Sequence, residues 1–136
     1  MADHTTYGLV CSELSEDLSK TNLGEFKLDS FQDNSVQIKI KAASLNFPDL
    51  LMTQGKYQNR PNLPFALGME GAGIVEQVGS GVSSFKEGDE VMFGGWGHGA
   101  IAESIILPES LVSLKPKSLN FSCLLYTSPS PRDVCS

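Results

Sequence analysis

The sequence predicts a mainly β fold, with antiparallel strands arranged in a barrel or sandwich that is closed or nearly closed. Short runs of branched and aromatic residues recur along the chain, separated by Gly, Pro and Asn, and one segment alone has helical features. The chain has 136 residues, of which 40% are hydrophobic. This is enough for one globular domain with a core and too short for two ordinary domains.

The clearest strand covers residues 35–41. Val36, Ile38 and Ile40 alternate there with polar residues, which is the period of a half-buried strand. The same reasoning, on weaker patterns, predicts strands over residues 7–13, 73–78, 90–93, 100–107 and 111–114.

The segment from residue 46 to residue 64 interrupts the strands. Asn46 can serve as an N-cap, Pro48 falls in the first turn, and Asp49 places a carboxylate at the positive end of the helix dipole. These features predict a short helix over residues 47–54, ended by Gly55. The proline-bounded residues 56–64 then form a surface loop.

Charge and apolar patterning narrow the classes of function. The net charge is −6 and no Lys/Arg cluster is present, which argues against binding to nucleic acid or to an anionic membrane. The N-terminus lacks a signal-peptide pattern, and no apolar run approaches the roughly 18 residues that span a bilayer. We therefore expect a cytoplasmic protein without a membrane span.

The three cysteines are Cys11, Cys123 and Cys135, and they form no C-x-x-C arrangement. Neither a disulfide framework nor a zinc knuckle is predicted, and Cys11 is expected in the core.

Three closely spaced glycines, Gly68, Gly71 and Gly73, suggest a phosphate-binding loop at first sight. A dinucleotide fingerprint must follow a strand and open a helix, whereas this segment follows a proline-rich loop and leads into the β-like run IVEQV. We therefore interpret the glycines as positions of close backbone approach within the β structure.

A series of motifs in a fixed order carries a family resemblance. The chain has Asn46 followed by Asp49, Gly55 followed by Tyr57, and then GMEGAGIV, VGSGV, FKEGDEV and GAIAE, in that order. This pattern resembles the N-terminal catalytic domain of the medium-chain dehydrogenase/reductase superfamily. It looks closest to the zinc-free quinone oxidoreductases, the zeta-crystallin-like group, and to the vesicle amine transport protein group.

The resemblance implies a GroES-like, partly open β-barrel with one or two short helices, as in the N-terminal domain of alcohol dehydrogenases. The barrel is expected to be incomplete, because this family takes its last strands from the extreme C-terminus. Sheet edges and apolar surface would then be left uncovered.

The departures from the zinc-containing members concern the metal. Those members have Cys where Asn46 stands and His where Met69 stands, beside Glu70. An amide and a thioether are poor ligands for zinc, so neither a catalytic nor a structural zinc is expected. The two histidines, His4 and His98, lie in unrelated segments and are expected to face solvent.

By resemblance, the chemistry is hydride transfer from NADPH to a quinone or an α,β-unsaturated carbonyl. Tyr57 is the candidate catalytic residue, and it would line the face shared by nicotinamide and substrate. Asn46, with Tyr57, would bind the cofactor by a hydrogen bond near the nicotinamide or its ribose. The residues alone also allow Tyr57 to be a partly exposed loop residue and Asn46 to be simply a helix cap.

Two neighbouring carboxylates receive structural interpretations. Asp49 is interpreted as a first-turn carboxylate and Glu70 as a hydrogen-bonded loop carboxylate near the cleft, because no zinc is expected beside it. Thr53 stands where relatives carry an arginine, so the charge contact of that arginine is not expected here.

The predicted organisation is a GroES-like catalytic domain over residues 1–121, followed by an atypical tail over residues 122–136. The tail, which holds two Ser-Pro steps, is predicted to be non-native or disordered. No Rossmann domain is present in the sequence, so most NADPH contacts are expected from a missing half, and the fragment alone is expected to be inactive. The full-length protein is expected to be a homodimer.

Two other functions remain open at this point. The chain could be a freestanding GroES-like binding module without catalysis, or a regulatory relative similar to the vesicle amine transport protein.

Overall fold

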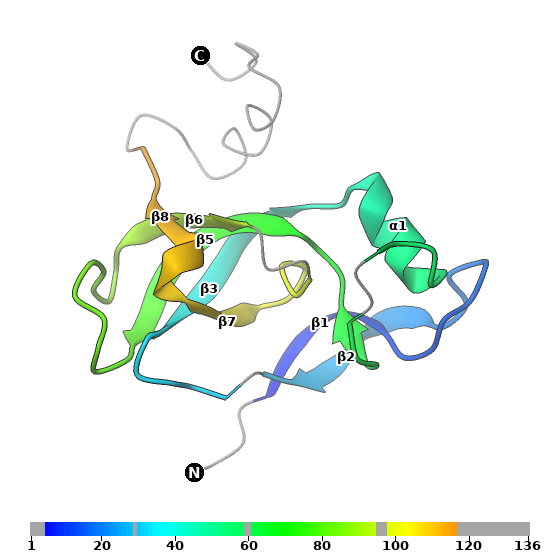
Figure 1. Cartoon of the computed structure of the whole chain (residues 1–136), viewed down its shortest axis with the longest axis horizontal. Coiled ribbons are helices and arrows are strands. Elements are labelled where there is room, and N and C mark those ends of the chain that lie inside the picture. The colour runs from blue at the N-terminus through cyan, green and yellow to red at the C-terminus, as the bar shows by residue number, and fades with distance from the viewer. Residues whose placement is uncertain (1–4, 29, 59–60, 95–97, 117–136) are drawn as a thin grey trace.

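The computed structural model describes residues 5–28, 30–58, 61–94 and 98–116. Within them the chain forms two antiparallel sheets and one α-helix (Figure 1). The mainly β class is therefore confirmed, with α1 and a 3₁₀ turn over Glu109–Leu111 as the short helices. None of the helices in these residues is long and apolar enough to cross a bilayer.

The smaller sheet has the strand order β2-β1-β4. Its strands are β1 (Thr5–Cys11), β2 (Thr21–Lys27) and the two-residue β4 (Phe65–Ala66). The helix α1 (Phe47–Thr53) lies at the same end of the molecule as this sheet (Figure 1).

The larger sheet has the order β7-β3-β5-β6-β8. Its strands are β3 (Ser35–Ser44), β5 (Glu70–Val78), β6 (Glu90–Gly94), β7 (Ser104–Pro108) and β8 (Val112–Leu114). The alternation predicted for residues 35–41 is confirmed, because Val36 and Ile38 are completely buried while Lys39 is exposed. Bulges in the pairing of β3 with β5 then shift the register after Gln37 and after Ile40.

The strand predictions missed β2 and the short β4, and they misplaced boundaries of β1, β5 and β7, which were expected over residues 7–13, 73–78 and 100–107. The sequence of β2, TNLGEFK, contains only two large apolar residues, and Leu23 is 66% exposed, so no apolar alternation marks this strand. Its pairing with β1 over seven residues forms it instead. The strand predicted for residues 100–107 begins only at Ser104, because Ala100 and Ile101 bond to the chain around Leu67.

The two sheets are joined by backbone hydrogen bonds around the segment that follows β4. Leu67 donates its N–H to the carbonyl of Leu9, and the carbonyl of Leu67 accepts from Ile101, at 2.9 and 2.8 Å. A single bridge between Gly8 and Ala102 continues this connection. The sheets do not close into a continuous barrel in the described residues, so the partly open form is confirmed and a closed form is wrong.

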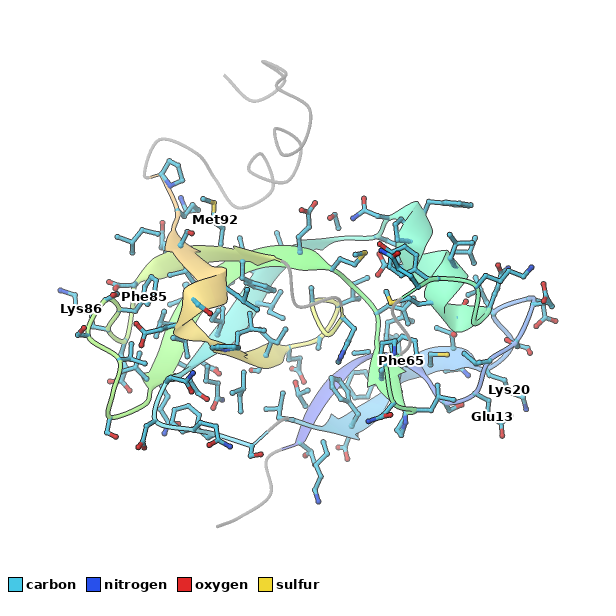
Figure 2. All side chains as sticks on the ribbon, viewed as in Figure 1. Glu13, Lys20, Phe65, Phe85, Lys86 and Met92 are labelled. Atoms are coloured by element: carbon cyan, nitrogen blue, oxygen red, sulfur yellow. The ribbon has the colours of Figure 1, made fainter. Side chains whose placement is uncertain are left out.

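The buried side chains form two clusters. The large core lies on the five-stranded sheet and comprises Val36, Ile38, Val75, Val91, Phe93, Ala100, Ile105, Leu107 and Val112. The small core comprises Cys11, Met52, Phe65 and Leu67. In Figure 2 the labelled Phe65 lies on the side of α1, whereas Phe85 and Met92 lie at the opposite end of the molecule. The prediction that Cys11 is a core residue is confirmed, since it is fully buried.

Candidate functional site

The start of α1 places Asn46 at the surface. Asn46 occupies the N-cap with extended backbone angles, and its N–H donates to Asp49 Oδ2 at 2.8 Å. Pro48 lies in the first turn, as predicted. The cap position of Asn46 is therefore confirmed, and its side chain remains exposed beside the helix.

Asp49 does more than the first-turn role that the sequence indicated. Its side chain is completely buried, and its second oxygen, Oδ1, accepts the backbone N–H of Gly68 at 2.9 Å. A buried carboxylate must be hydrogen-bonded, and both oxygens of Asp49 accept from backbone donors. Asp49 thus joins the start of α1 to the segment before β5. The position of Asp49, three residues after an N-cap, predicts its contact with the N–H of Asn46. Nothing in the sequence predicts its contact with the N–H of Gly68.

Gly68 shows why a glycine is needed in this segment. Its φ is +104°, and a Cβ atom there would lie 2.6 Å from the backbone nitrogen of Ile101. Any larger residue would therefore combine a strained backbone with a clash. Gly71 and Gly73 likewise face neighbouring atoms of β3, including the carbonyl of Lys39 beside Gly73. The prediction of close backbone approach is confirmed.

A short hydrogen-bonded chain runs from Glu70 to Asn46. Ser44 and Glu70 are direct partners in the pairing of β3 with β5, and Ser44 Oγ donates to Glu70 Oε1 at 3.1 Å. Asn46 Nδ2 in turn donates to Ser44 Oγ at 3.2 Å. The interpretation of Glu70 as a hydrogen-bonded carboxylate is confirmed, although it begins a strand rather than lying in a loop.

Tyr57 follows α1 and is half-buried. It packs against the small core, where Met69 also lies as a partly buried neighbour. The hydroxyl of Tyr57 makes no hydrogen bond to another described residue. No hydrogen bond joins Tyr57 to Asn46 within the described chain either. Asn46 precedes the first turn of α1, and Tyr57 follows its last turn.

The structure also tests what the sequence predicted for Thr53 and for the histidines. Thr53 is the last residue of α1 and is fully buried, and its hydroxyl donates to the carbonyl of Leu50 at 2.7 Å. His98 was expected to face solvent, which is wrong. It is half-buried, and its ring meets Phe65 edge-on with centroids 6.0 Å apart. His4 and the predicted tail lie outside the described residues.

The donor atoms around Asn46 do not form a metal-binding set. Among the described residues, no group of three or more His, Cys, Asp or Glu side chains is arranged to hold a metal ion. A cavity of about 260 Å³ lies elsewhere, between the end of β2, β4 and β7, and is lined in part by Phe26, His98 and Ile105. Neither Asn46 nor Tyr57 lines it.

Comparison with known proteins identifies the family to which this fold belongs. Residues 32–117 match the alcohol dehydrogenase GroES-like domain. The chain belongs to this family. It is 34% identical over 114 residues to the quinone oxidoreductase-like protein 2 homolog of Nematostella vectensis, a match that covers 84% of this chain and 31% of that protein. It is 41% identical over 90 residues to the rat synaptic vesicle membrane protein VAT-1 homolog, a match that covers 63% of this chain and 21% of that protein.

Solved structures give the same result. A probable oxidoreductase from Mycobacterium abscessus superimposes with a TM-score of 0.82 at 28% identity, covering 94% of this chain and 40% of that one. A Pseudomonas syringae quinone oxidoreductase gives a TM-score of 0.78 at 28% identity, covering 93% and 42%. The resemblance to the medium-chain dehydrogenase/reductase superfamily is confirmed. The chain spans about a third or less of the two curated relatives described above.

Proposed function

We propose that the chain is the GroES-like catalytic part of an NADPH-dependent oxidoreductase that reduces quinones or α,β-unsaturated carbonyls without zinc. The observation that carries this proposal is the exposed, hydrogen-bonded Asn46 at the start of α1, in a chain that matches proteins named quinone oxidoreductases. An amide is suited to bind a nicotinamide or a ribose hydroxyl, and it is a poor zinc ligand.

We propose that Asn46 and Tyr57 meet the nicotinamide end of the cofactor. When bound, the cofactor supplies the hydride, and the protein contributes binding and orientation. Asn46 would contribute a directional hydrogen bond, and Tyr57 would contribute an aromatic face and a hydroxyl donor for the carbonyl oxygen of the acceptor. Most other cofactor contacts are proposed to come from a dinucleotide-binding domain beyond residues 1–121.

The case against zinc rests on the same positions. Asn46 and Met69 offer an amide and a thioether where zinc-dependent members have thiolate and imidazole. We propose that the site orients its substrate by hydrogen bonds and packing. The complete protein is further proposed to be a cytoplasmic homodimer.

A regulatory relative without catalysis is the second candidate, because the VAT-1 homolog is 41% identical over 90 residues. Such a protein would keep the fold and cofactor binding but would not reduce quinones. Measuring cofactor binding and turnover on the same preparation separates the two candidates.

The experiment begins with the source gene, read past the codon for residue 121, and continues with the encoded protein. NADPH oxidation is measured with a panel of quinones and enones, with and without a chelator. The proposal expects turnover that the chelator leaves unchanged, and a fall of about 10-fold to 100-fold in kcat for Tyr57→Phe if its hydroxyl stabilises the developing oxyanion. Chelator-sensitive turnover, or cofactor binding without any turnover, would contradict it.

A further inference from the structure

The short chain of hydrogen bonds from Glu70 through Ser44 to Asn46 has a fixed direction. A carboxylate accepts hydrogen bonds and donates none, so the hydroxyl proton of Ser44 must point to Glu70, 3.1 Å away. That hydroxyl then has only lone pairs left for its second neighbour. Asn46 must therefore meet it with the Nδ2 amino group, at 3.2 Å, and not with the carbonyl oxygen.

The consequence concerns what Asn46 offers to a ligand. The backbone N–H of Asn46 is held by Asp49 at 2.8 Å, which fixes where the side chain begins. With Nδ2 turned to Ser44, the side-chain oxygen Oδ1 is the acceptor end of the amide; it faces the backbone N–H of Asp49 in the capping box of α1 and, because Asn46 is exposed, has a second lone pair for a ligand. An amide in either orientation has the same shape, so only its hydrogen-bond partners decide which end is presented.

We propose that Glu70, acting through Ser44, is a positioning residue that sets Asn46 to present Oδ1, so that the site selects a ligand with a hydrogen-bond donor. This proposal rests on the proposed function, in which Asn46 meets the nicotinamide end of the cofactor. The matching donors there are the N–H₂ of the carboxamide and the hydroxyls of the ribose. Glu70 thereby has a use at a site where no zinc is expected.

The first test needs no ligand. In ¹⁵N-labelled protein, the side-chain NH₂ of Asn46 is observed by NMR in wild type and in Ser44→Ala and Glu70→Gln. The amide introduced by Glu70→Gln can donate as well as accept, so it no longer dictates the direction of the Ser44 hydroxyl. The proposal expects the Asn46 NH₂ protons to shift upfield and to exchange faster with water in both variants. Unchanged NH₂ signals in both would overturn it.

Glu76→Gln is the matched control. Glu76 lies on the same strand and also accepts from a serine, with its Oε2 3.2 Å from Ser104 Oγ. The substitution removes the same charge from β5 without touching the contacts of Asn46. Its Asn46 signals should match those of wild type.

The second test uses reduced nicotinamide mononucleotide at millimolar concentration as the probe. Loss of one oriented hydrogen bond should weaken binding of this probe by about threefold to tenfold in Glu70→Gln relative to Glu76→Gln. Equal affinities in these two variants, with the probe still shifting the Asn46 signals, would overturn the proposal. These measurements use the complete protein encoded by the source gene, because most cofactor contacts are proposed to lie beyond residue 121. If the probe binds neither wild type nor any variant of it, the proposed function fails, and the ligand-free NMR comparison alone decides whether Glu70 orients Asn46.

A third arm identifies the donor. The 3-acetylpyridine analogue of the probe keeps the carbonyl group but lacks the amide N–H₂. Weaker binding of this analogue to wild type, with the difference reduced in Glu70→Gln, supports the carboxamide as the donor. Undiminished binding, with the Glu70→Gln effect retained, supports a ribose hydroxyl.

Discussion

The large core and the small core are held together in different ways. The large core draws nine buried residues from the five-stranded sheet and the segment leading into it, and its packing follows the alternation of apolar side chains along strands. The small core has four buried residues, and its neighbours Tyr57 and Met69 are only partly buried. Around it, backbone hydrogen bonds and the buried Asp49 carboxylate connect segments distant in sequence.

The difference bears on the predicted site, which lies near only one of the two cores. The predicted site lies on the side of the small core, where few side chains fix the structure and single polar contacts matter more. The large core supplies a rigid sheet from which Ser44 and Glu70 project. Ser44 and Glu70 are therefore held by the paired strands β3 and β5, whereas Asn46 and Tyr57 lie before and after α1.

The largest effect is expected from the large core. Ile38→Ala removes a completely buried side chain from the middle of β3 and should lower the free energy of unfolding by about 4 kcal/mol. Met52→Ala, in the small core, should cost about 2 kcal/mol, because neighbouring half-exposed side chains can move into the space. Urea unfolding of both variants measures the difference. Equal losses would show that the two cores are equally well packed.

The next effect should come from Asp49. Asp49→Ala leaves the buried N–H of Gly68 and the N–H of Asn46 without their acceptor, which should cost about 3 kcal/mol. Asp89→Ala is the control, because Asp89 also accepts a backbone N–H, that of Lys86 at 3.0 Å, but in an exposed turn. Its cost should stay at about 1 kcal/mol. Similar melting temperatures for the two variants would contradict the role given to Asp49.

A smaller effect is expected where the two sheets meet. Gly68→Ala meets both a positive φ and the backbone of Ile101, and should cost about 2 kcal/mol. Gly88→Ala has a similar φ, +91°, with nothing within 4 Å of the added Cβ, and should cost about 1 kcal/mol. Amide hydrogen exchange at Leu67 and Ile101 should accelerate only in Gly68→Ala. Acceleration in both variants would mean that the close approach is unimportant.

Much of this fold was predictable because its signals are local. The alternation in β3, the cap at Asn46 and the stop at Gly55 each act over a few residues, and the structure has a strand, a helix start and a turn in a positive-φ conformation there. The strand β2 was missed because its seven residues are mostly polar or exposed, and pairing with β1 alone makes them a strand.

The same division applies to the site. The sequence placed Asn46 and Tyr57 on either side of a short helix, and it placed glycines where the backbone would come close. It could not show that Asp49 reaches Gly68, nineteen positions away, or that the register of β3 on β5 sets Ser44 opposite Glu70. Those contacts depend on strand register and on how the two sheets are joined, which many residues determine together and no short pattern encodes.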